Sequence, residues 1–306
     1  MQENLNKALL YETLYSLSSG NEKKAYGLYC DVAAVCSVSQ PLFSIMKEVM
    51  GVTGLPDTAI SSAYNTVKHS FDSYPFNYEI LSREDPLFPS SLKDIHFLYL
   101  FGNTSLLEGE RVTLLGMRGP TEDARLDAVH AVGELKSAGV TLMTTLDTGL
   151  DAYISRYAFN QKLRQIVVLA SPLHQCVPQT QQDLMVGIAN SGPLGLLVSP
   201  FAPCRRAQKW FTVPRNDVLA ALSRTIVIIE EKDGGPLWKL CAKAGDAGCR
   251  IMIANTCASN PLYSYAAAFV SRGASLYRKN DLKKMFSSAQ ERKRDKKKDD
   301  GQLELF

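Results

Sequence analysis

The sequence contains no apolar run that approaches the roughly 20 residues needed to span a membrane. Its first residues, Met1 to Asn4, are polar and lack the basic-then-apolar layout of a secretory signal peptide. We therefore expect a cytoplasmic protein that makes no use of a membrane. With 45% apolar and 21% charged side chains in 306 residues, the composition is that of an ordinary globular chain of about two domains.

Paired cysteines are also lacking. The seven cysteines are an odd number and include no C-x-x-C pair, which predicts reduced thiols and no structural metal. Cys241, Cys249 and Cys257 recur at intervals of eight residues. Three metal ligands or three separate elements of an α/β repeat would both produce this spacing, and we favour the second interpretation.

A strong charge of one sign is missing as well. The formal net charge is +3, from 34 basic and 31 acidic side chains. Ten Lys/Arg and six Asp/Glu lie between Arg278 and Phe306, so this tail carries +4 and the rest of the chain −1. Any affinity of the body for nucleic acid must therefore come from a local patch of cations.

The chain divides into three segments, of which the first comprises residues 1–76. It has no proline in its first forty positions and spaces apolar residues such as Leu10 and Leu14 as a helix does, which predicts a small all-helical domain. Gly51 and Gly54 then mark a connection between two helices. This connection is either a plain turn or a helix-hairpin-helix whose amides contact a DNA phosphate.

The second segment, residues 77–278, alternates short apolar runs with stretches long enough for crossover helices. Continuously apolar strands are buried on both faces, which predicts an α/β fold with a Rossmann-like, doubly wound, mainly parallel sheet. Ligands of such sheets bind outside the carboxyl ends of the strands. The predicted strands are Phe97–Phe101, Arg111–Leu115, Val140–Thr144, Ile166–Leu169, Leu194–Val198, Thr225–Ile229 and Arg250–Ile253.

The third segment, residues 279–306, begins with a short helix candidate and continues with a charged run from Glu291 to Lys298. This run has no apolar stripe to bury, which predicts a basic, solvated and flexible linker. The chain then closes with the apolar peptide Gln302–Phe306.

The end of one predicted strand carries residues suited to a phosphate. Gly116 and Gly119 allow the backbone to approach an anion, Arg118 offers a bidentate donor, and Thr121 would cap the following helix. The segment matches neither the G-x-G-x-x-G fingerprint nor a Walker loop. A phosphate cradle and a simple strand-to-helix turn remain alternatives here.

The next strand end holds Asp147, Gly149 and Asp151. Gly149 would admit a ligand, and Asp151 would cap a helix or accept a hydrogen bond from the Arg118 loop. None of the four histidines follows a strand at a spacing that would make these aspartates catalytic, and no zinc or Ser-His-Asp pattern occurs. We therefore predict no catalytic residue, no metal and no cofactor.

The densest mixture of basic and aromatic residues in the body lies between Pro203 and Asp217. Cations for phosphates and flat rings for unstacked bases are what single-stranded nucleic acid requires. The alternative is that the aromatic residues, Trp210 and Phe211, belong to the core. The candidate DNA contacts here are Arg205, Arg206, Lys209, Arg215 and Asn216.

Taken in order, these strand ends resemble the DNA-processing protein A (DprA, or Smf) family. Asp85–Ile95 is similar to the family's lead-in Y-P-x-x-L-x-x-I, and Gly116–Arg118 stands where the family has G-S-R. Thr144–Asp151 corresponds to S-G-L-A-x-G-I-D. Arg215–Ser223 corresponds to R-N-R-I-I-A-G-L-S and leads into a V-V-E strand, here Thr225–Glu230.

This resemblance implies a non-enzymatic protein that binds single-stranded DNA in recombination or natural transformation, forms a homodimer and contacts a RecA-type recombinase. The departures are Met117, Thr144-Thr145 and Asp217, the last of which puts a negative charge where the family has an arginine. Such a change near phosphates weakens binding at low salt. The matching pocket residues are Gly116, Arg118, Gly149, Asp151, Arg215 and Asn216.

The final peptide resembles the Q-L-x-L-F motif by which many bacterial repair and replication proteins hold the β sliding clamp. Gln302 offers an amide, and Leu303, Leu305 and Phe306 offer apolar side chains for a pocket. The resemblance implies that the linker tethers the body to the clamp. An apolar end that folds back on the body is the alternative.

Two other functions are compatible with this sequence. An adaptor that links the clamp to another factor would have lost DNA binding, as Asp217 and the near-neutral body suggest. A nucleotide-processing enzyme on the same fold would need P-G-G-x-G-T and a following glutamate, whereas Gly234-Gly235-Pro236 has a different order.

Overall fold

A computed structural model describes residues 2–75 and 77–287, and the chain forms two compact units. Unit 1 comprises Met1–Phe101, Ala170–Cys176 and Val198–Pro214, and unit 2 comprises Gly102–Leu169, Val177–Leu197 and Arg215–Phe306. The charged run and the Gln302–Phe306 peptide lie outside the described residues.

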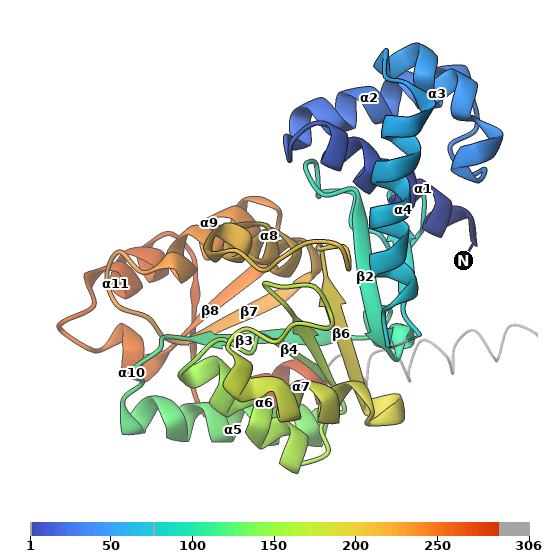
Figure 1. The fold of residues 1–306 in the computed structure, drawn as a ribbon. Helices are drawn as coiled ribbons and strands as arrows, with labels where there is room; N and C mark the ends of the chain where they lie inside the picture. Colours follow the sequence, from blue (N-terminus) through green and yellow to red (C-terminus); the bar gives the residue numbers. More distant parts are fainter. Residues whose placement is uncertain (1, 76, 288–306) are drawn as a thin grey trace, which may run out of the picture. The chain divides into compact units, whose positions relative to one another are not determined.

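Unit 1 contains the predicted helical segment. Its helices are α1 (Gln2–Leu17), α2 (Glu22–Val35), α3 (Met46–Thr53) and α4 (Asp57–Asp72), and α1 packs against both α2 and α4 (Figure 1). Gly54 closes α3 in the left-handed conformation with φ 67°, whereas Gly51 lies inside the helix. The expected helix stop and new helix start are therefore present.

Two strands complete the regular structure of the N-terminal part of unit 1. β1 (Glu79–Ser82) pairs antiparallel with β2 (Phe97–Gly102), with Ile80 opposite Tyr99. The sequence analysis predicted β2 but missed β1. Only four residues long, β1 has one exposed and three buried positions and thus no alternating pattern to reveal it.

Unit 2 is built from strands and helices that alternate along the chain. The strands are β3 (Arg111–Gly116), β4 (Thr141–Thr144), β5 (Gln165–Val168), β7 (Thr225–Glu230), β8 (Arg250–Ala254) and β9 (Ser275–Tyr277), while β6 (Gly195–Ser199) begins in unit 2 and ends in unit 1. The helices are α5 (Glu122–Ala138), α6 (Leu150–Asn160), α7 (Gln182–Ala189), α8 (Thr212–Leu222, which starts in unit 1), α9 (Pro236–Asp246), α10 (Asn255–Ala258) and α11 (Ser264–Ser271).

The strands of unit 2 lie in the order β5-β4-β3-β7-β8-β9, and every neighbouring pair in this order is parallel. Helices α5 and α6 cover one face of this sheet, and α8 and α9 cover the other (Figure 1). Every residue of β4, β5 and β7 is buried, which explains why these strands read as continuous apolar runs. The predicted doubly wound, mainly parallel α/β fold is confirmed.

The chain after β9 returns to α5. Residues 281–287 are helical, with Leu282 and Phe286 buried. The buried carboxylate of Glu134 on α5 accepts hydrogen bonds from the backbone N–H groups of Asn280 and Leu282. A carboxylate at a helix start satisfies amides that have no partner within the helix.

Three further features bear on function. No helix in the described part of the chain has both the length and the apolar character to cross a membrane. All seven cysteines are free thiols, and Cys241, Cys249 and Cys257 lie on α9, directly before β8, and on α10. Within residues 2–75 and 77–287, no three His, Cys, Asp or Glu side chains gather in a way that would hold a metal ion.

Candidate nucleic-acid interface

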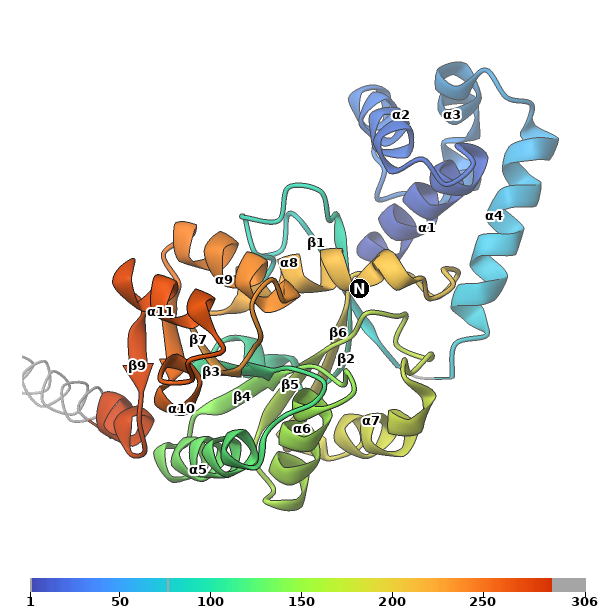
Figure 2. The same ribbon diagram turned by 90° about the vertical axis from the view of Figure 1, so that its left-hand side faces the viewer.

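The strand order of unit 2 creates one position where ligands of such folds bind. From β3 the chain builds outward through β4 and β5, then returns to place β7 on the other side of β3, with Thr113 in register with Ile226. The carboxyl ends of β3 and β7 therefore flank a topological switch point. The loops after β3, β4 and β7 meet there, as seen in the centre of Figure 2.

The loop after β3 is held by its own backbone. The N–H of Gly116 donates to Asp151 Oδ1 at 2.8 Å, and the N–H of Met117 donates to the carbonyl of Glu230 at 2.9 Å. The carbonyl of Met117 accepts from the N–H of Leu150 at 3.0 Å. These bonds connect the loop to β7 and to the start of α6.

Arg118 is the next residue, and its side chain is exposed. It forms no ion pair with any residue that the structure describes. Gly119 beside it is exposed too. This loop therefore presents an uncompensated guanidinium to solvent from a fixed backbone, which suits a phosphate.

Gly149 has a different role from the one expected. Its φ is 100°, and a Cβ at this position would lie 2.3 Å from the Cα and the carbonyl oxygen of Arg118. The close approach that requires glycine here is thus made by the Arg118 loop and not by a ligand. At Gly116 the neighbour is a side chain, because a Cβ there would lie 2.3 Å from Leu150 Cδ2.

Asp151 supports the loop from inside the molecule. It is buried, and its second oxygen accepts a hydrogen bond from the Thr145 hydroxyl at 2.7 Å. Burial raises the pKa of Asp151 to about 7; the negative charge of Asp147 adds to this rise, and the hydrogen bonds from Thr145 and Gly116 oppose it. The expected hydrogen bond to the Arg118 loop is present, and the carboxylate faces away from solvent.

The start of α5 is occupied by protein groups. Thr121 caps the helix, as predicted, since its hydroxyl accepts from the N–H of Ala124. Its own N–H and hydroxyl donate to the buried carboxylate of Glu230 at 2.8 and 3.0 Å. Glu122 and Asp123 also lie in the first turn, and their negative charges disfavour an anion at this helix start.

Arg215 differs from its predicted role. We expected its guanidinium to face DNA, but the side chain is only 5% exposed and donates to Asp147 Oδ2 at 2.8 Å. Its Nε donates to the Asn216 side chain at 2.9 Å. A buried guanidinium needs a counter-charge, and Asp147 from the β4–α6 loop supplies it. Arg215 and Asn216 thus connect α8 to this loop.

Asp217, which places a negative charge where the family has an arginine, forms an ion pair. Lys243 on α9 pairs with its carboxylate at 2.6 Å, and both side chains retain exposure. The negative charge beside the switch point is therefore partly neutralised by a cation that sequence reasoning did not connect with it, because the two positions meet only across α8 and α9.

The structure also corrects the prediction that Arg205 contacts DNA. Within unit 1 its guanidinium is buried against the carboxylate of Glu12, donates to Glu22 at 3.0 Å and lies over the ring of Tyr15. Glu12 is itself buried on α1 and requires a cation. Arg205 therefore holds the 203–208 loop to α1 and is not available to a phosphate.

The neighbours of Arg205 keep the predicted exposure. Arg206 and Lys209 are exposed, and Trp210 is 49% exposed. Phe211, by contrast, is buried and stacks on Phe201 with ring centroids 3.7 Å apart. Of the two aromatic residues, Phe211 belongs to the core of unit 1, and Trp210 is exposed and follows Lys209 in the sequence.

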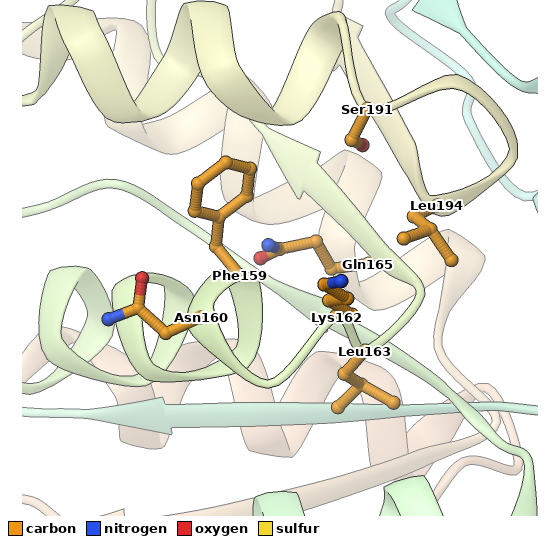
Figure 3. A pocket seen from close by; sticks show the side chains of 7 residues that line it. All are labelled: Phe159, Asn160, Lys162, Leu163, Gln165, Ser191 and Leu194. Atoms are coloured by element: carbon orange, nitrogen blue, oxygen red, sulfur yellow. The ribbon is translucent and has the colours of Figure 1, made fainter.

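A cavity of about 490 Å³ occurs elsewhere in unit 2. It lies near the amino end of β5 and is lined mainly by Phe159, Leu163, Leu194 and the stem of Lys162, together with Gln165 (Figure 3). The Gln165 side chain, although polar, is already hydrogen-bonded to Ser155. None of the predicted site residues lines this cavity.

The fold defines a class: a Rossmann-like α/β protein that carries an exposed arginine on a braced loop at the carboxyl edge of its sheet. The sequence model of the DNA recombination-mediator protein A family matches residues 79–287, and the chain belongs to this family.

Several known proteins are similar. The DNA processing protein DprA of Bacillus subtilis is 26% identical over 170 residues, covering 55% of this chain and 53% of the relative. That of Streptococcus pneumoniae is 23% identical over 182 residues, covering 58% and 62%. These matches thus span between half and two thirds of the relatives' own lengths.

Two solved structures share the fold. The S. pneumoniae DNA processing protein A covers 92% of this chain and 94% of its own with a TM-score of 0.65 at 18% identity. The Helicobacter pylori protein, described for its single-stranded DNA binding mode, covers 71% and 97% with a TM-score of 0.59 at 19% identity.

Proposed function

We propose that this protein binds single-stranded DNA as a recombination mediator, and that Arg118 is its central phosphate contact. The observation that carries the proposal is the exposed guanidinium of Arg118, which has no ion-pair partner among the described residues. It lies on a loop braced by Gly149 and Asp151 at the switch point. Family membership and the DNA-binding description of the H. pylori protein support it. The role is one of binding and not of catalysis.

The electrostatic argument favours Arg118 over the other predicted arginines. Arg205 and Arg215 each have a carboxylate partner and little exposure, so a phosphate would have to displace that partner. Arg118 has no such competitor among the described residues. A phosphate therefore gains the full charge-assisted bond without breaking another.

Unit 1 offers a second contact of the same chemistry. Arg206 and Lys209 would meet phosphates, and the exposed ring of Trp210 would stack on a base. Stacking tolerates any base because every base has a flat face, so this contact would add affinity without sequence preference.

The test is a fluorescence-anisotropy titration of a labelled single-stranded oligonucleotide. We expect Arg118→Ala to weaken binding about tenfold at about 50 mM salt and to flatten the dependence of affinity on salt. Arg224→Ala is the matched control, because Arg224 is an exposed arginine directly before β7, at the opposite edge of the sheet. Equal losses in both variants would remove Arg118 from the site.

We also propose a location and partners that fit this function. We propose that the protein acts in the cytoplasm, forms a homodimer and delivers its strand to a RecA-type recombinase. We also propose that Gln302, Leu303, Leu305 and Phe306 dock on the β sliding clamp. The family relationship supports the first set, and the peptide sequence supports the second.

A specific observation favours the adaptor alternative. Arg205 and Arg215, two of the predicted DNA contacts, are neutralised by carboxylates. The titration distinguishes the two functions. An adaptor that has lost DNA binding is indicated if wild type and Arg118→Ala bind equally weakly, and if neither protein distinguishes single-stranded from double-stranded DNA.

A further inference from the structure

An aromatic pair on α6 has no role in the core. Tyr153 is 37% exposed, and its ring lies nearly parallel to that of Tyr157, with an interplanar angle of 10° and centroids 6.4 Å apart. The two residues are four positions apart and therefore occupy the same helix face on successive turns. Tyr153 is exposed and Tyr157 is half-buried, so part of the flat apolar surface of this pair stays in contact with water.

A cation from the neighbouring helix faces this pair. The guanidinium of Arg125 on α5 lies 6.0 Å from the ring centroid of Tyr153, and α5 and α6 run side by side in both views (Figures 1 and 2). Glu122 pairs with Arg125 only at 3.7 Å, and both side chains remain exposed, so the charge of Arg125 stays available.

The pair is continuous with the Arg118 loop. The backbone of Arg118 touches Gly149, and the N–H of Tyr153 donates to the carbonyl of Gly149 at 3.2 Å. Tyr153 thus lies one helical turn beyond Gly149, the residue that supports Arg118, and Tyr157 lies one turn further along α6.

We infer that Arg118, Arg125, Tyr153 and Tyr157 form one surface, the α6 platform, that stacks the bases of a single DNA strand whose phosphate is held by Arg118. The inference rests on the proposed function and extends it from a phosphate site to a track. Cations that alternate with flat rings select an unpaired polynucleotide, because a duplex hides the faces of its bases.

The experiment compares two lengths of oligothymidine, about 6 and about 20 nucleotides, in anisotropy titrations of the full chain. Tyr153→Ala should lose about fivefold or more in affinity for the long strand and lose less for the short one. Tyr153→Phe, which keeps the ring, should bind as wild type. Tyr265→Ala on α11 is the control, because Tyr265 is 46% exposed but lies elsewhere in unit 2.

A second readout separates stacking from loss of fold. An oligonucleotide that carries 2-aminopurine should show quenching with wild type and with Tyr153→Phe, and less quenching with Tyr153→Ala. Far-ultraviolet circular dichroism checks that each variant is folded.

The outcomes separate the two proposals. If Arg118→Ala weakens binding while Tyr153→Ala matches wild type at both lengths, the platform is overturned and the phosphate site stands. If Tyr153→Ala alone weakens binding, Arg118 holds no phosphate, and both the platform as defined and the phosphate site are overturned. Failure of wild type to bind either strand overturns both.

Discussion

Asp151 is enclosed at the start of α6, where its two oxygens accept from Gly116 and Thr145. Burial costs the charged form its hydration, and this raises the pKa of Asp151 to about 7, against an ordinary value of about 3.9. Between these values the folded state keeps a proton that the unfolded state releases. The stabilisation that this proton provides is complete below about pH 4 and is lost as the pH rises towards 7.

Asp151→Asn should remove this pH dependence, because asparagine is neutral at every pH. We expect the free energy of unfolding of the variant, relative to wild type, to increase between about pH 4 and about pH 8 by up to roughly 4 kcal/mol, the equivalent of three pKa units. Urea denaturation at several pH values measures it. A constant difference between the two proteins would show that Asp151 titrates normally in the folded state.

At the scale of elements, the β4–α6 loop and α8 are joined by the pair Asp147–Arg215. The two partners differ, because Arg215 is buried while Asp147 is 31% exposed. Removing Asp147 leaves a buried guanidinium without a carboxylate partner, whereas removing Arg215 lets Asp147 return to water.

Asp147→Ala should therefore destabilise the protein by about 2 kcal/mol or more, and Arg215→Met by less. The double variant should be more stable than Asp147→Ala alone, which urea denaturation of all three proteins would show. If Arg215 contributes only to stability, Arg215→Met should keep the affinity for single-stranded DNA within about twofold. A loss as large as that of Arg118→Ala would make Arg215 a direct phosphate contact.

At the scale of the whole molecule, positive charge is unevenly distributed along the chain. The segment from Arg278 onward carries +4 and ends in Gln302–Phe306, while the rest carries −1. If the end peptide binds a partner as proposed, this segment would raise the local concentration of that partner near the body of the protein.

Deleting Gln302–Phe306 should abolish co-purification with the β sliding clamp and leave the affinity for an oligonucleotide within about twofold. Glu304→Ala is the matched control, because Glu304 occupies the position that Q-L-x-L-F leaves open. Clamp binding that survives the deletion, or that is lost equally in the control, would contradict the assignment of this peptide.

Much of the fold was accessible from local patterns. All seven predicted strands form, because strands buried on both faces are apolar over most of their length. The missed strands, β1 and β9, are only four and three residues long and depend on neighbours rather than on their own pattern. Thr121 as a helix cap was likewise readable, since capping depends on residues close in sequence.

The sequence by itself determined the alternation of strands and helices, the helical N-terminal part and the family, because periodicity and short motifs are local properties. Only the tertiary structure decided which of the predicted arginines are exposed and which are paired with carboxylates. The sequence alone does not distinguish Arg118, Arg205 and Arg215 as candidate DNA contacts. In the structure, Glu12 pairs with Arg205 and Asp147 pairs with Arg215, each from a distant part of the chain. Whether a charge is buried and paired depends on such long-range contacts, and a linear pattern does not contain them.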